Sequence, residues 1–297
     1  MKFSIILPAL LASLGLAAQA ADKLPVVASF SILGDLVQQV GGDKVAVRSL
    51  VGPDGDAHVY QPSPQDGKIL VGARLLVVNG IGYEGWMDRL IRASQYKAAR
   101  LVASDKITAQ KMGGDPAARG KLDPHAWQDP ARVRQYVSNI AASLVSADPA
   151  NADYYRQRAD NYNNELFALE KWAAEQVAGI APAKRRVITS HDAFGYLGRR
   201  FGIQFLAPQG MNTEAEASAR EVGKLIRQAK QQGIKAVFVE NISNPKLLEQ
   251  ISRETGGRIN QGKLFSDALS GPDGPAASYL AMMRHNIGTL VAGMKQN

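Results

Sequence analysis

The longest periodic pattern of hydrophobic residues in the chain lies between positions 148 and 179. Its apolar residues recur at alternating steps of three and four, a spacing that places them on one face of an α-helix. The residues of this apolar stripe are Tyr155, Ala159, Tyr162, Leu166, Leu169, Ala173 and Val177. Asp148 is suited to capping the first free amides, Pro149 to the first helical position and Gly179 to the end of the helix. The pattern predicts a single helix about 45 Å long.

On both sides of this helix, short runs rich in β-branched residues alternate with amphipathic stretches. The runs predict strands at 24–30, 45–51, 75–79, 101–102, 186–189, 203–206, 236–239 and 261–265. Shorter helices are predicted at 32–40, 65–71, 86–93, 130–145, 193–201, 212–232 and 279–294, with one more starting at Pro245. The repeated order of strand and helix predicts mostly parallel sheets flanked by helices.

We therefore predict an α/β fold with two lobes joined by one long rigid helix, and a binding site in the crevice between the lobes. The predicted first lobe covers residues 21–147, the linking helix 148–180 and the second lobe 181–297. The alternative is that the long helix packs against one large domain, which a chain of 297 residues can also form.

The first twenty residues have a different composition. Lys2 is followed by an apolar run over residues 3–16 and then by Ala18-Gln19-Ala20. This order is typical of a secretory signal peptide, with cleavage predicted before Ala21. The apolar run is too short to span a bilayer as a permanent anchor. We therefore expect residues 1–20 to be removed and the mature protein to be exported to the periplasm.

Composition narrows the class of protein further. Hydrophobic residues make up 45% and charged residues 21%, which is ordinary for a soluble globular protein. The chain has no cysteine, which excludes disulfides, thiolate metal sites and a lipid anchor on a cysteine. A free periplasmic protein is the prediction that follows. The net charge of +8 is scattered, and no basic patch is interleaved with aromatic residues, so we expect no nucleic-acid partner.

Candidate chemistry comes from the histidines. Three of the four, His58, His125 and His191, fall in loops that follow predicted strands. The segment around His125 is restricted by Pro124 and anchored by a tryptophan, which lowers the cost of ordering it for binding. The fourth, His285, lies within a predicted helix, and we interpret it as an ordinary residue of the helix surface.

Asp267 follows the predicted strand 261–265 in the same way. Neutral imidazoles with one carboxylate form a borderline donor set that suits Zn²⁺, and four such ligands complete a tetrahedron. Glu240 also ends a predicted strand, and we interpret it as a structural or supporting residue. Because the four candidate ligands are far apart in the sequence, spacing alone does not establish the site.

Four segments, 56–58, 123–127, 190–197 and 264–270, carry these residues in a fixed order. Their sequences, DAH, DPHAW, SHDAFGYL and LFSDALS, resemble the signatures of the zinc/manganese substrate-binding proteins of bacterial ABC transporters. The resemblance covers essentially the whole mature chain. It implies two α/β lobes bridged by a rigid helix, with the membrane permease of the transporter as the partner of the protein. The resemblance also implies metal ligands at His58 and His125 in the first lobe, and at His191 and Asp267 in the second. We also expect the protein to be a monomer.

Two features depart from the family pattern. Ala57 stands where the family usually has a proline before the first histidine, which predicts a looser loop. The loop from Gly113 to Gly120 contains no histidine, whereas zinc-uptake members often carry a histidine-rich loop there. This absence leaves open a manganese-type member, or one loaded by a partner metallochaperone. In the family, glutamate at the position of His191 accompanies manganese and histidine accompanies zinc, so we expect zinc, with manganese as the alternative.

Functions of another class have to be weighed against transport. Three histidines can hold a catalytic zinc with water in the fourth position, as in an exported zinc hydrolase. Asp267 would fill that fourth position, and no His-Glu-x-x-His motif supplies a general base, so we do not expect an enzyme. An adhesin or a zinc chaperone on the same scaffold would share the site with an uptake protein.

Overall fold

The computed structural model describes residues 22–112, 120–210, 213, 217–260 and 262–297. The predicted signal peptide at 1–20 lies outside these residues, as do positions 113–119 of the histidine-free loop and the start of the helix predicted at 212–232. Within the described part of the chain, every helix is too short or too polar to span a membrane.

The first half of the chain forms a parallel four-stranded sheet in the order β2-β1-β3-β4. Its strands are β1 (Leu24–Phe30), β2 (Val45–Val51), β3 (Leu75–Val78) and β4 (Ala99–Val102). The helices of this half are α1 (Ser31–Gly41), α2 (Pro64–Val71), α3 (Met87–Ser94) and α4 (Pro130–Ala147). All four residues of β3 and most residues of β1 are apolar and buried, as expected for a sheet covered on both faces.

The second half repeats the arrangement with shorter strands, in the order β6-β5-β7-β8. They are β5 (Arg186–Ile188), β6 (Gln204–Leu206), β7 (Ala236–Val237) and β8 (Arg258–Ile259), and all of their pairings are parallel. The helices are α6 (Gly195–Phe201), α7 (Ala219–Gln231), α8 (Lys246–Thr255) and α9 (Tyr279–Met294). Single 3-10 turns lie at 42–44, 126–128, 149–151 and 182–184.

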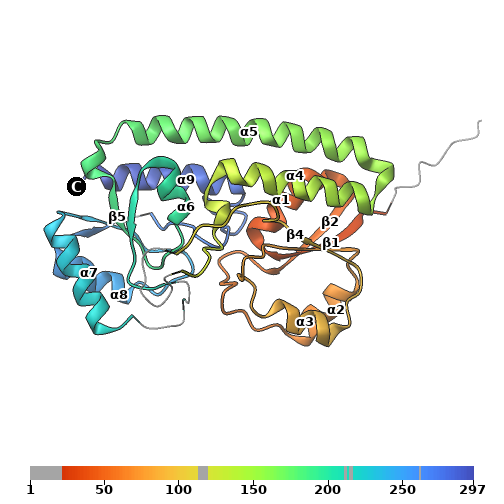
Figure 1. The fold of residues 1–297 in the computed structure, drawn as a ribbon, viewed down its shortest axis with the longest axis horizontal. Helices are drawn as coiled ribbons and strands as arrows, with labels where there is room; N and C mark the ends of the chain where they lie inside the picture. Colours follow the sequence, from red (N-terminus) through yellow and green to blue (C-terminus); the bar gives the residue numbers. More distant parts are fainter. Residues whose placement is uncertain (1–21, 113–119, 211–212, 214–216, 261) are drawn as a thin grey trace, which may run out of the picture.

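One helix, α5 (Ala152–Ala178), runs along both halves of the molecule (Figure 1). Its 27 residues span about 40 Å. Its buried residues are the seven of the predicted apolar stripe, and they pack against α1, α4 and α9. The prediction of an α/β fold with two mostly parallel sheets and one long helix across them is therefore confirmed.

Two local predictions were wrong. Asp148 does not cap the long helix; its Oδ2 accepts hydrogen bonds of 2.7 Å from the side chains of Asn151 and Tyr155, and a 3-10 turn precedes α5. The strand predicted at 261–265 is also absent among the described residues of that segment. The strand of this region is the earlier β8, and Leu264 forms an isolated parallel bridge with Glu240.

Candidate metal centre

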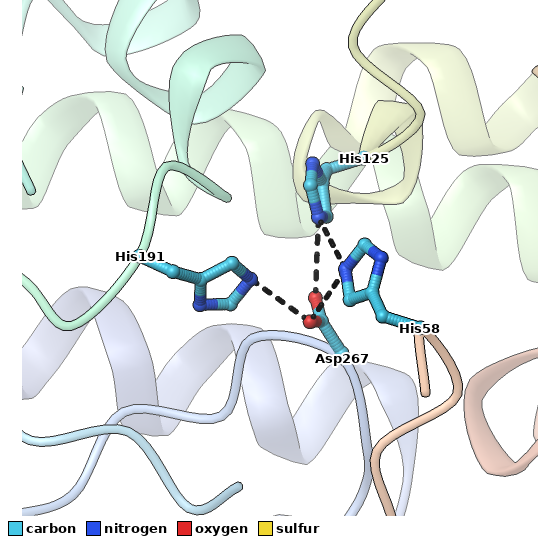
Figure 2. A group of neighbouring side chains, drawn as sticks. All are labelled: His58, His125, His191 and Asp267. Carbon is cyan, nitrogen blue, oxygen red and sulfur yellow. Dashed lines mark hydrogen bonds and ion pairs between the residues drawn. The ribbon is translucent and has the colours of Figure 1, made fainter. Parts of the chain in front are cut away.

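The four predicted ligands lie together, with their side chains pointing toward one another (Figure 2). His58 is in the loop between β2 and α2, and His125 immediately precedes the 3-10 turn 126–128. His191 follows β5 and forms a parallel bridge with Gln209, while Asp267 follows the Leu264 bridge. One ligand atom from each of the four residues lies within 4.8 Å of all the others.

The distances between these atoms fit a shared cation. Asp267 Oδ2 lies 3.0 Å from His191 Nε2 and 3.3 Å from His58 Nε2. His58 Nε2 lies 3.2 Å from His125 Nε2, which is 3.7 Å from Asp267 Oδ1. A tetrahedral Zn²⁺ with bonds of about 2.0 Å separates neighbouring ligand atoms by about 3.3 Å. Only small shifts would bring the four atoms onto one ion.

The cluster is removed from water. His125, His191 and Asp267 are fully buried, and the side chain of His58 is only 6% exposed. Within the described chain, neither carboxylate oxygen of Asp267 makes a well-directed hydrogen bond, and neither does His191 Nε2. A buried carboxylate is costly unless a charge or a ligand compensates it. A divalent cation at the centre of the cluster would compensate this one.

The surroundings of the cluster shift the pKa values of His58 and His191 in opposite directions. Burial lowers the pKa of His58, so its imidazole is neutral and available to a metal at neutral pH. Burial also opposes protonation of His191, but the charges of Glu240 and Asp267 outweigh it and raise the pKa of His191 well above its ordinary value. For Asp267, burial is outweighed by the neighbouring His191 and His125, which hold its pKa well below the usual range.

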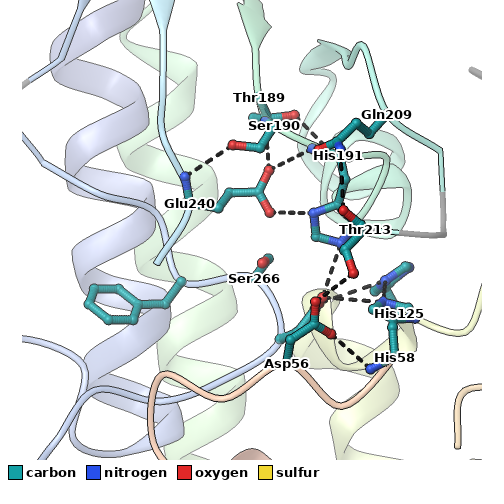
Figure 3. A network of polar contacts seen from close by, with 12 residues as sticks. Asp56, His58, His125, Thr189, Ser190, His191, Gln209, Thr213, Glu240 and Ser266 are labelled. Atoms are coloured by element: carbon teal, nitrogen blue, oxygen red, sulfur yellow. Dashed lines mark hydrogen bonds and ion pairs between the residues drawn. The ribbon is translucent and has the colours of Figure 1, made fainter. Parts of the chain in front are cut away.

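Two of the rings are oriented by carboxylates behind them. Nδ1 of His125 lies 2.7 Å from Asp123 Oδ1, and Nδ1 of His191 lies 2.6 Å from Glu240 Oε2. In each ring Nδ1 then faces the carboxylate, which directs Nε2 toward the place of a metal. Figure 3 shows His191 between Glu240 and the rest of the cluster. Such carboxylate–histidine pairs are typical of protein metal sites.

Glu240 contacts both the backbone and the ring of His191. Its Oε1 accepts hydrogen bonds from the backbone N–H groups of Ser190 at 2.7 Å and His191 at 3.0 Å, while Oε2 faces the ring of His191. It lies on the opposite side of that ring from Asp267. A general base must reach a water near the metal. This position therefore agrees with a supporting residue, as interpreted from the sequence.

His58 is held differently, through the backbone of its loop. Asp56 Oδ1 accepts from the His58 N–H at 2.8 Å, and Asp56 Oδ2 accepts from Thr213 Oγ1 at 2.5 Å. The carbonyl of the preceding Ala57 accepts from Trp86 Nε1 at 2.8 Å. The ring itself packs edge-on against Tyr83. The loop thus has specific anchors in the place of the family's proline.

His285, interpreted as a helix-surface residue, is outside the cluster. Its Nε2 lies 2.8 Å from the carbonyl of Lys263 and its ring packs against Phe265. The supporting roles of Asp123 and Thr213 were not predicted. The Asp-x-His spacing that recurs at 56–58 and 123–125 was the available signal for Asp123, because a side chain two residues upstream can bond back to the histidine. No local pattern marks Thr213.

Comparisons with known proteins place the chain in a family. Residues 26–293 match the family described as "Zinc-uptake complex component A periplasmic". The manganese-binding lipoprotein MntA of Bacillus subtilis is 32% identical over 94% of this chain and 92% of its own. The iron-binding protein YfeA of Yersinia pestis is 31% identical over 93% and 88%. The periplasmic zinc-binding protein TroA of Treponema pallidum superposes with a TM-score of 0.85 at 27% identity, over 92% of this chain and 99% of TroA.

These relatives correct the predicted localisation. The absence of cysteine led us to predict a free periplasmic protein without a lipid anchor. The relative MntA is named a lipoprotein, and so is SloC of Streptococcus mutans, which is 31% identical over 99% of both chains. The prediction was wrong because it rested on a residue count alone, with no weight given to how relatives are attached.

The relatives are named for manganese, iron and zinc, so their names agree on metal binding and differ in the metal. The match over residues 26–293, together with three histidines and an aspartate gathered between two parallel sheets, shows that this chain belongs to the family of metal-binding substrate-binding proteins of ABC transporters.

Proposed function

We propose that the protein captures Zn²⁺ with His58, His125, His191 and Asp267 and delivers it to the membrane permease of an ABC transporter. The observation that carries this proposal is the spacing of three imidazole nitrogens and one carboxylate oxygen in a buried cluster. The cation is the cargo, so binding has to be both strong and reversible. A site assembled from separate segments of the chain can meet both requirements, because moving one segment opens it.

The donor set favours zinc over manganese. Nitrogen-rich tetrahedral sites suit Zn²⁺, whereas Mn²⁺ prefers more oxygen ligands and a higher coordination number. Zn²⁺ also binds a given site more tightly than Mn²⁺ in the usual affinity order. Two carboxylates support the imidazoles from behind and raise their basicity as ligands.

A manganese-binding protein is the second candidate. Asp267 presents both of its oxygens to the cluster, one 3.0 Å from His191 and the other 3.7 Å from His125. Bidentate binding by this carboxylate would give five ligands and move the site towards the preferences of Mn²⁺. The relative from Bacillus subtilis is named for manganese.

We further propose a monomer that performs no catalysis. One chain supplies all four ligands, so the site needs no second copy. A fourth protein ligand leaves no coordination position for the water that a zinc hydrolase needs. A metallochaperone is a candidate donor of the metal, because the loop from 113 to 120 contains no histidine that could collect it. We also propose that residues 21–147 form the first lobe, residues 148–180 the linking helix and residues 181–297 the second lobe.

Metal competition tests the proposal. Metal-free protein is equilibrated with Zn²⁺ and Mn²⁺, each in the same excess over the protein, separated from free metal and analysed by mass spectrometry. We expect one Zn²⁺ per chain and at least about a hundredfold preference over Mn²⁺. The variant His285→Ala is the matched control and should behave as the unsubstituted protein. Equal or greater retention of Mn²⁺ would favour the second candidate.

A further inference from the structure

The hydrogen bonds on the two sides of residue 266, just before Asp267, lead mainly to different halves of the molecule. Up to Phe265 the chain is bonded to the second half: Leu264 N donates to Val239 O at 2.9 Å, and both backbone groups of Phe265 bond to the side chain of Asn286 in α9. From Ser266 on, most partners belong to the first half; the exception is Asn241 of the second half, whose Nδ2 donates to Ala268 O at the longer distance of 3.4 Å. The Ser266 carbonyl accepts from Trp127 Nε1 at 2.8 Å and from Gln128 Nε2 at 2.6 Å.

The contacts of the following residues continue the same way. Leu269 N donates to Ser31 Oγ at 3.0 Å, and Leu269 O accepts from Asp54 N at 2.9 Å. Tyr279 N, at the start of α9, donates to Asp35 Oδ2 at 2.7 Å. Segment 266–279 therefore follows the second sheet in sequence but is bonded mainly to α1 and to the loops of the first half. Asp267 lies at the start of this segment.

The residues that support the other three ligands are also divided between the two halves of the molecule. The carbonyl before His58 is held by Trp86, and the ring of His125 is held by Asp123, both in the first half. His191 alone is anchored to the second sheet. Glu240 binds its ring and its backbone N–H, and Ser190 Oγ accepts from Glu240 N at 3.3 Å.

We propose that Gln128 positions Asp267 through the carbonyl of Ser266, so that His58, His125 and Asp267 form a preassembled three-ligand platform on the first half and His191 is the one ligand carried by the second sheet. The inference rests on the proposed function and deepens it by assigning an order. Metal binds the platform first, and His191 then completes the site. Release begins with the loss of His191, because moving the second sheet displaces this ligand alone.

The variant Gln128→Met tests the positioning role. Methionine keeps the length of the side chain and removes the donor to Ser266 O, while the bond from Trp127 remains. Gln38→Met is the matched control, because Gln38 Nε2 also donates to a single backbone carbonyl, Gly42 O at 2.7 Å, away from the site.

We expect Gln128→Met to release zinc about tenfold faster than the unsubstituted protein, as removal of a residue supporting a metal ligand does. The absorption bands of its Co²⁺ form should shift, because the geometry of the bound Asp267 changes. The melting temperature of the metal-free protein should match that of Gln38→Met, and Gln38→Met should release zinc at the unsubstituted rate. Unchanged release and an unchanged Co²⁺ spectrum would overturn the inference.

Removal of single ligands gives an independent check. His191→Ala should keep a weaker zinc site made of the three platform ligands, with its Co²⁺ form still four-coordinate through a water. Asp267→Ala should lose zinc to a chelator that His191→Ala resists. Equal loss in both variants would overturn the inference and leave the proposed function intact. Failure of the unsubstituted protein to bind zinc would overturn the proposed function and the inference with it.

Discussion

An aspartate two residues before a histidine acts alike at two places in this chain. Asp56 Oδ1 accepts from the backbone N–H of His58 at 2.8 Å, and Asp123 Oδ1 accepts from that of His125 at 3.0 Å. Asp123 additionally holds the ring of its histidine. The four candidate ligands were predicted from the sequence because each follows a strand and lies in a recognisable motif. The partner of His191 was not assigned, because Glu240 is 49 residues away and no local pattern joins the two.

The role of Glu240 is testable with Glu240→Gln. The amide oxygen can still accept from the backbone of Ser190 and His191, but the amide NH₂ then faces His191 Nδ1. This favours the tautomer with the proton on Nε2, where the metal should bind. We expect zinc affinity to fall about 10- to 100-fold with the fold retained. Competition with a chromophoric chelator measures this loss.

The control for that substitution is Glu249→Gln on the exposed face of α8, which is remote from the cluster. It should leave the affinity unchanged. If Glu240→Gln bound zinc as tightly as the control, the assigned orientation of His191 would be wrong.

The charge state of His191 gives a second prediction at this scale. Burial disfavours its protonation, but the charges of Glu240 and Asp267 outweigh it and raise its pKa well above the ordinary value, which favours the protonated ring before metal binds. Zinc has to displace this proton, and affinity should therefore rise with pH until the group is deprotonated. We expect about one proton released per zinc at pH 7.

Calorimetry in buffers of different ionisation enthalpy measures that proton. The heat of binding should change in proportion to the buffer's ionisation enthalpy. The same heat in every buffer would mean that no proton leaves, and His191 would then be neutral before the metal arrives.

At the scale of elements, the long helix was the most predictable part of the fold. Its stripe of seven apolar residues is the buried set of α5, because a pattern that repeats over many turns averages out local exceptions. Its start was mispredicted, because Asp148 bonds to side chains of its own segment instead of the free amides. The strands of the second sheet, two or three residues long, are too short for an apolar run to locate them accurately.

The packing of α5 can be tested with Leu166→Ala. Leu166 is fully buried in the stripe, so truncation leaves a cavity between α5 and the helices beneath it. We expect a loss of about 2–5 kcal/mol in the free energy of unfolding. The neighbouring Phe167 is 62% exposed, and Phe167→Ala should change stability by no more than about 0.5 kcal/mol. Urea unfolding compares the two variants, and equal losses would contradict the assigned face of the helix.

At the scale of the whole molecule, two parallel sheets bring together four segments that are far apart in the sequence. Loops at the carboxyl ends of parallel strands meet at one edge of a sheet, which is why the strand–helix order indicated the site. The family resemblance implied that Asp267 belongs to the second lobe. Segment 266–279 follows the second sheet, and its bonds to Trp127, Gln128 and Ser31 depend on tertiary contacts that no periodicity encodes. The lobe boundaries remain a prediction for the same reason.

The central claim is that one Zn²⁺ is shared by His58, His125, His191 and Asp267, and zinc-edge X-ray absorption of the loaded protein tests it most directly. The account predicts four ligands, all nitrogen or oxygen, at about 2.0–2.1 Å, with multiple-scattering features from three imidazoles. A shell of six oxygen-rich ligands, or the same three-imidazole signal in His125→Ala, would contradict it.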